Sequence, residues 1–112
     1  MIEYPEIAKA ILDGLLLGID VDMSDAEHGF TIRIRLTKFK VKHELQFLEV
    51  QSYAIGGQVN YGSYIEQLKC FKLKDGCIYF SLDPYDQDAG EDERDDGLIV
   101  AKHIRLDGEP VI

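Results

Sequence analysis

The pattern of hydrophobic and polar positions changes along the chain from a helical period to a two-residue period. Over residues 5–17, apolar side chains recur three and four positions apart, which predicts one amphipathic helix. Pro5 suits the first helical position because its missing N–H would lack a partner there, and Gly18 suits the end of the helix. We expect this helix to pack on a sheet. Its apolar stripe consists of Tyr4, Ile7, Ala8, Ile11, Leu12 and Leu15.

From residue 19 onward, apolar and polar residues alternate, which predicts β-strands. Apolar residues of both parities occur after residue 41, so a helix over residues 41–50 is an alternative to a strand there. The parity of the apolar positions slips after Leu36, which we interpret as a bulge or a turn within residues 37–42. The expected strands cover residues 19–24, 30–37, 43–55, 64–74, 77–82 and 98–106.

The last strand has apolar side chains on both faces, and its core face is assigned by parity. We expect the tail after this strand, residues 107–112, to be irregular. The side chains expected to face the core are Leu98, Val100, Ile104 and Leu106.

The dipeptide Asp75-Gly76 lies between two β-prone runs and predicts a two-residue hairpin turn, because both turn positions require a positive φ. In the register set by that turn, Phe71 lies opposite Phe80, and the hydrophobic pattern agrees with this pairing. The local signal and the apolar pattern therefore predict one hairpin.

The chain contains two cysteines, Cys70 and Cys77, on the strands of this hairpin. In the expected register they are separated along the ladder by about 13 Å, at ~3.3 Å per residue. This separation exceeds the reach of a disulfide, so we expect two free thiols, as in a reducing compartment.

Together these elements predict one α+β domain that spans residues 1–112. The expected architecture is an N-terminal helix packed on a curved antiparallel sheet of five to six strands, as a roll or an open barrel. The composition, 46% hydrophobic and 29% charged, is typical of a globular protein.

Charge is concentrated in the acidic loop, which we define as residues 83–97 between the last two expected strands. The loop carries eight carboxylates and one arginine, a net charge of -7 within the -9 of the whole chain. An acidic chain argues against binding to nucleic acid or to an anionic membrane, both of which require a basic face. The segment before the first apolar stretch has no basic residues, unlike a signal peptide, and we expect a cytoplasmic protein.

The acidic loop resembles a calcium-binding loop only in part. Asp86 and Asp88 match the first ligand positions of an EF-hand, but the template fails at three places, among them Gly90 and Gly97. A different calcium site that includes Asp83 is an alternative. We favour a solvated, mobile connector, because like charges repel and hydration relieves the repulsion, and a docking surface for a basic partner is the other hypothesis.

Other motifs give weak chemical signals. The segment from Gly57 to Gly62 has the glycine spacing of a phosphate loop but lacks its lysine. None of His28, His43 and His103 has a second histidine at metal-ligand spacing, and a cysteine nucleophile beside His103 would require that neighbouring strands bring the two together. The sequence therefore predicts no catalytic residue, no metal and no cofactor.

We interpret the chain as a small acidic binding module without enzymatic activity, possessing the charge and size of an inhibitor or immunity-type protein for a basic protein. The carboxylates would steer the encounter, and tyrosines near the sheet edge would add affinity. The alternative is a small-molecule-binding or catalytic roll with a pocket between helix and sheet, into which His43, Tyr53 or Arg33 would point. The oligomeric state is not predicted. The candidate partner-binding residues are Asp86, Asp88, Glu91, Asp92, Glu93, Asp95, Asp96, Tyr53, Tyr61 and Tyr64.

Overall fold

The computed structural model describes residues 2–23, 29–56 and 61–112. One helix precedes a seven-stranded sheet in which every neighbouring pair of strands is antiparallel. The strand order is β1-β2-β3-β6-β5-β4, with β7 added to β6. In the described part of the chain the terminal strands β1 and β4 do not pair, so the sheet is open. The elements are α1 (Pro5–Ile11), β1 (Leu15–Asp22), β2 (Phe30–Lys38), β3 (Val41–Ala54), β4 (Lys69–Lys72), β5 (Ile78–Asp83), β6 (Asp96–Leu106) and β7 (Glu109–Pro110).

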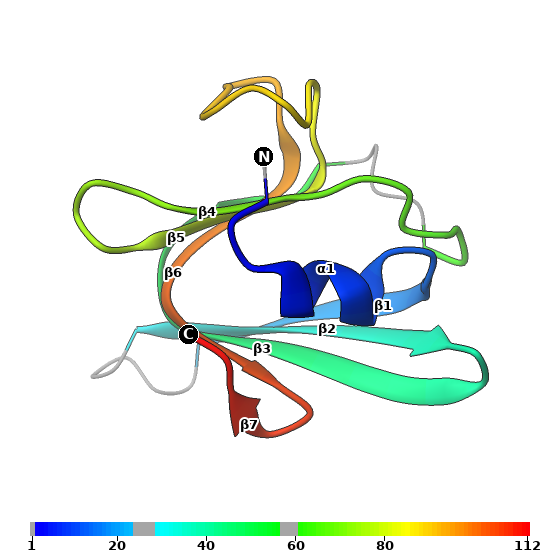
Figure 1. The fold of residues 1–112 in the computed structure, drawn as a ribbon. Coiled ribbons are helices and arrows are strands. Elements are labelled where there is room, and N and C mark those ends of the chain that lie inside the picture. The colour runs from blue at the N-terminus through cyan, green and yellow to red at the C-terminus, as the bar shows by residue number, and fades with distance from the viewer. Residues whose placement is uncertain (1, 24–28, 57–60) are drawn as a thin grey trace.

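The two longest strands, β3 and β6, bend the sheet around the helix. Their buried residues change parity at the same level, from the pair Phe47 and Ile104 to the pair Val50 and Ala101. Glu49 has a φ of 53°, outside the β region, at the change in β3. Figure 1 shows the result, with β2 and β3 below α1, β4 and β5 above it, and β6 curving between them.

The helix is shorter than the sequence pattern predicts. Its stripe is confirmed at Ile7 and Ile11, which are fully buried, but α1 ends at Ile11 instead of residue 17. Asp13 has a φ of 67°, which is not helical, and Leu15 begins β1. Ladder pairing with β2 and burial of Leu16 take the place of the last helical turn. The first strand therefore covers 15–22 and not 19–24; residue 24 lies outside the described residues.

The β4–β5 hairpin is present, but its predicted register is wrong by one residue. Phe71 pairs with Tyr79 instead of Phe80, and Cys70 pairs with Phe80. The turn is wider than predicted, because Leu73 N–H donates to Cys77 O and Gly76 alone takes a positive φ. Cys70 therefore faces the core. Cys70 and Cys77 are both unpaired, as expected.

The strand expected over residues 43–55 is confirmed as β3, and the helical alternative for residues 41–50 is wrong. Two other segments differ from the expected elements. The strand expected over residues 64–74 is confined to β4, because the segment before it bonds to the chain around Gly14 through Ile65. The tail is not wholly irregular, since Asp107 and Gly108 form a two-residue turn into β7.

The core face of β6 agrees with the one assigned by parity at Ile104 but not in the first part of the strand. Ile99, Ala101 and Ile104 are fully buried, whereas the expected Leu98 and Val100 are only half-buried. The bend in β6 reverses the parity part-way along the strand, so a single alternation does not describe it.

Candidate functional site

The acidic loop folds back over the face of β4 and β5 that points away from the core. The opposite face, with Cys70 and Phe80, belongs to the main hydrophobic cluster. Lys69, Tyr79 and Ser81 point toward the loop, and each bonds to a loop residue. This cover explains why five consecutive residues of β5 are buried, although a strand with one solvated face would alternate.

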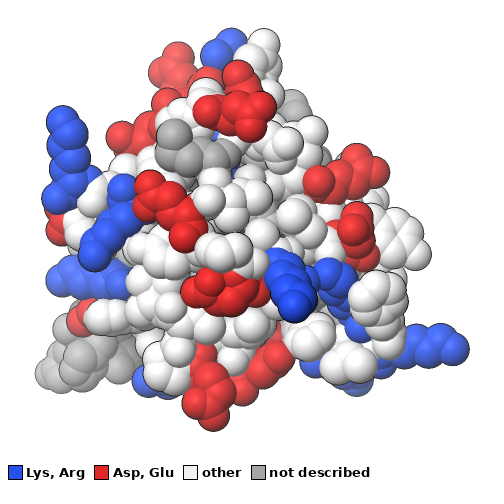
Figure 2. Space-filling view, in the orientation of Figure 1, with Lys and Arg blue, Asp and Glu red and all other residues white. Residues whose placement is uncertain are grey.

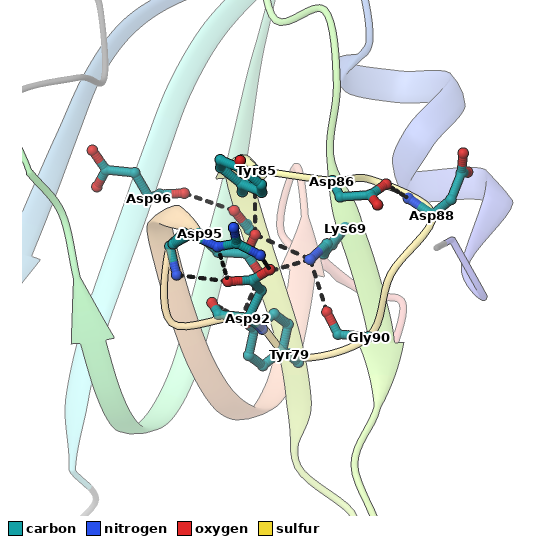
Figure 3. Close-up of polar contacts among 11 residues, drawn as sticks. Lys69, Tyr79, Tyr85, Asp86, Asp88, Gly90, Asp92, Asp95 and Asp96 are labelled. Atoms are coloured by element: carbon teal, nitrogen blue, oxygen red, sulfur yellow. Dashed lines mark hydrogen bonds and ion pairs between the residues drawn. The ribbon is translucent and has the colours of Figure 1, made fainter.

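A buried ion pair anchors the loop to β4. The Nζ atom of Lys69 lies 3.0 Å from Oδ1 and 2.8 Å from Oδ2 of Asp95, and 2.7 Å from the carbonyl oxygen of Gly90. These three acceptors match the three N–H donors of an ammonium group. Figure 3 shows Lys69 reaching from its strand to both sides of the loop. One side chain thus fixes two separate points of the acidic loop.

The Asp95 carboxylate receives two further hydrogen bonds. The Tyr79 hydroxyl donates to Oδ2 at 2.6 Å, and the backbone N–H of Tyr85 donates to Oδ1 at 2.9 Å. Burial alone would raise the pKa of Asp95, but the hydrogen bonds from Lys69, Tyr79 and Tyr85 outweigh it and lower the pKa. Asp95 is therefore held in its charged form inside the protein. Burial and the bond to this carboxylate raise the pKa of Tyr79.

A second cluster stabilises the exposed side of the loop. Arg94 donates from Nε and Nη2 to the two oxygens of Asp92, at 2.9 and 2.8 Å. These bonds lower the pKa of Asp92 to about 2. The Arg94 guanidinium also lies 3.7 Å from the centre of the Tyr85 ring, a cation–π contact. The one cation of the loop is thus bonded to a carboxylate of the same loop. The exposed carboxylates around it remain a source of negative electrostatic potential.

Two other carboxylates act as acceptors for backbone N–H groups. Asp86 Oδ1 accepts from Asp88 at 3.0 Å and forms a local turn. Asp96 Oδ1 accepts from Gly56 at 2.7 Å and ties the loop to the chain after β3. Burial and the charge of Asp96 raise the pKa of Asp83, its partner across β5 and β6. The loop is held at both ends and in the middle.

The structure separates the predicted partner-binding carboxylates into groups. Asp86, Asp88, Glu91 and Glu93 are exposed, and Asp92 and Asp96 are half-buried. The expectation of a wholly solvated acidic loop is wrong at Asp95, whose side chain is shielded from solvent by the ion pair. Asp95 therefore positions the loop and is not available to a partner.

The predicted tyrosines lie on other elements. Tyr53, on β3, packs edge-on against Phe30 with ring centroids 6.2 Å apart. Tyr61 and Tyr64 are exposed on the segment that pairs with the start of β1. Within the described residues, no hydrogen bond or ring contact joins these three side chains to the acidic loop.

Of the residues expected in a pocket between helix and sheet, His43 lines an open groove between α1 and the β2–β3 hairpin, and its Nδ1 lies 2.7 Å from Asp107 Oδ2. Arg33 does not line this groove and lies 3.6 Å from Glu44. The rest of the interface between α1 and the sheet is filled by apolar side chains such as Ile7 and Ile11. His28 and residues 57–60 of the glycine-rich segment lie outside the described residues.

The residues that sequence reasoning missed are Lys69, Tyr79 and Tyr85. A signal for Lys69 exists in the sequence, because this lysine has Leu68 before it and Cys70 and Phe71 after it. A lysine in a strand that is buried on both faces needs a buried carboxylate. Nothing local identifies Asp95 as that carboxylate.

Comparisons with protein-family models, with curated proteins and with solved structures give no significant match. In the described ranges, no three His, Cys, Asp or Glu side chains are grouped to hold a metal ion. None of the described helices has the length and apolarity to cross a bilayer.

Proposed function

We propose that this chain is a binding protein that docks on a basic surface of another protein through its acidic loop. The observation that carries the proposal is the internal anchoring of the loop by Lys69 and Asp95, with exposed carboxylates around the anchor. An inhibitor or immunity-type protein that neutralises a basic enzyme acts in this way. The two unpaired cysteines support a reducing compartment such as the cytoplasm.

The charge of the loop favours rapid encounter with a basic surface. Its net charge is -7, and among the residues that the structure describes, Lys69 is the one cation from outside the loop that bonds to it. In the view of Figure 2, acidic side chains gather at the top of the molecule, where Figure 1 places the loop. A concentrated field of one sign raises association rates by about 10- to 1,000-fold at low salt.

The fixed shape of the loop favours specificity. A loop that is ordered before binding loses less conformational entropy when the complex forms. Asp86 and Asp92 bond within the loop, so the backbone that carries Glu91 and Glu93 has a defined course. These two exposed glutamates, with no hydrogen bond of their own among the described residues, are the side chains best placed to meet a partner.

Affinity purification from cell extract at low and moderate salt, followed by association kinetics with the captured protein, tests the proposal. We expect a basic protein whose association rate falls steeply with salt. The double variant Glu91→Gln, Glu93→Gln should slow association about tenfold. The matched control Glu66→Gln, Glu109→Gln removes the same charge from exposed sites outside the loop and should have little effect. Recovery of no basic protein, or binding that is indifferent to salt, contradicts the proposal.

A further inference from the structure

The turn between β2 and β3 exposes an aromatic side chain among lysines. Phe39 and Lys40 are the two turn residues, because Lys38 pairs with Val41 across the hairpin. Phe39 is 88% exposed and Val41 is 55% exposed. Lys42 follows directly, so three lysines alternate with two exposed apolar residues. This composition is the opposite of the acidic loop in charge.

The backbone of this turn is unfavourable for its residues. Phe39 and Lys40 have φ values of 51° and 66°, in the left-handed region that Asn and Gly usually occupy in two-residue hairpins. Phe39 is too exposed for burial to offset this cost, and its ring contact in the described structure is with the neighbouring Lys38. Exposed apolar residues in a disfavoured conformation are typical of an interaction surface.

An open groove of about 530 Å³ lies beside the turn. Lys9 and Ala10 of α1 line one side, and Lys38, Phe39 and Val41 of the hairpin line the other. Lys38 Nζ donates to the carbonyl oxygen of Lys9 at 2.6 Å, which ties the hairpin to the end of the helix. This hydrogen bond therefore connects the two sides of the groove, α1 and the hairpin, with apolar surface between them.

The charges around the groove favour an anionic occupant. Lys9 and Lys38 line it, and Lys40 and Lys42 continue the positive charge along the hairpin. Glu6 is the carboxylate among the lining residues. His43 also lines the groove, and its Nδ1 is held by Asp107. In Figure 2, basic side chains project at the right, where Figure 1 places the end of this hairpin, away from the acidic top.

We propose that this groove binds an acidic segment of a second partner protein, with one large apolar side chain inserted between α1 and the hairpin. The lysines would pair with carboxylates on either side of that side chain, which gives charge complementarity around an apolar contact. A concave groove fits a protruding side chain better than a flat lipid surface. This surface lies outside the acidic loop, so the inference does not depend on the function proposed for the loop.

Selection of a displayed library of random short peptides on the full chain tests the proposal. The expected result is enrichment of peptides that combine Asp or Glu with Phe, Leu or Trp, whose binding weakens as salt rises. The Phe39→Asn variant should bind the selected peptides at least about tenfold more weakly, while Phe39→Leu retains most of the affinity. Asn suits the left-handed turn, so this variant removes the apolar contact without disturbing the hairpin.

The second measurement compares two double variants that each remove two lysine charges. Lys40→Gln, Lys42→Gln should weaken the selected peptides and flatten their salt dependence, whereas Lys74→Gln, Lys102→Gln on other exposed positions should not. The proposal is overturned if acidic apolar peptides are not enriched, if binding is indifferent to Phe39→Asn, or if the protein self-associates through this hairpin. Binding of phosphatidylserine vesicles with no peptide binding also overturns it.

Discussion

Lys69 Nζ lies 2.8 Å from Asp95 Oδ2, and both side chains are completely shielded from solvent, although the residues are 26 positions apart. A buried ion pair is tolerated when the remaining donors and acceptors are bonded. Here Gly90, Tyr79 and Tyr85 supply those bonds. Among the described residues, no buried side-chain nitrogen or oxygen lacks a hydrogen-bond partner. The pair therefore joins the acidic loop to the sheet without the free-energy cost of an unpaired buried charge.

Replacing Lys69 by Met should destabilise the protein by about 3–5 kcal/mol, because it leaves the Asp95 charge buried without its partner. The double variant Lys69→Met, Asp95→Leu should be less destabilised than the single one, since it removes the unpaired charge as well. Urea denaturation followed by circular dichroism measures both. Lys72→Met, an exposed position on the same strand, is the control and should change stability by under about 1 kcal/mol. A loss of similar size in both single variants would contradict the assignment of the pair.

The lowered pKa of Asp95 predicts loss of stability in acid. The unfolded chain titrates near the ordinary value of 3.8, and the folded protein releases its proton at lower pH. The unfolded state therefore binds more protons in this range, so the free energy of unfolding falls as pH drops from above 3.8 through the folded pKa. Asp107, bonded to His43, contributes in the same direction. Unfolding measured between about pH 5 and pH 2 should show a shallower slope for Lys69→Met, Asp95→Leu than for the wild type.

The sequence predicted best the elements that have one face in the core and one toward solvent or side-chain ion pairs. On β2, where the sequence alternates between apolar and polar residues, Ile32, Ile34 and Leu36 are all fully buried. The start of α1 at Pro5 was also predicted correctly, from the preference of proline for the first helical position. At these places the residue pattern and the tertiary environment agree.

The pattern failed where both faces of a strand are covered. On β5, consecutive residues are buried, so the alternation that agreed with a two-residue turn did not fix the register. The pair Asp75-Gly76 suits a two-residue turn and also a wider one with Gly76 left-handed, and tertiary packing selected the second. The anchoring of the acidic loop was invisible for a related reason: no local rule pairs Lys69 with Asp95.

Gly14 marks a close approach between the end of α1 and β2. A Cβ atom there would lie 2.6 Å from Leu36 Cδ1 and 2.9 Å from the carbonyl oxygen of Ile11. We expect Gly14→Ala to destabilise the protein by about 1–3 kcal/mol, the usual cost of overpacking a core. Gly90→Ala is the control, because a Cβ at Gly90 meets nothing within 4 Å and the carbonyl that Lys69 uses is kept. Thermal unfolding of the two variants decides the matter, and equal stability would refute the close packing at Gly14.

The two free thiols should differ in how they become reactive. Cys70 is fully buried in the core, and burial with the nearby Glu6 and Glu3 charges raises its pKa to about 12. Burial and the adjacent Asp75 also raise the pKa of Cys77, but this residue closes the hairpin turn at the end of the sheet. Because hairpin ends open locally at lower free energy than a core strand, we expect a disulfide reagent to modify Cys77 first and Cys70 only on unfolding. Labelling rates of Cys70→Ala and Cys77→Ala, with and without urea, measure the order. Faster native-state labelling of Cys70 would contradict its placement facing the core.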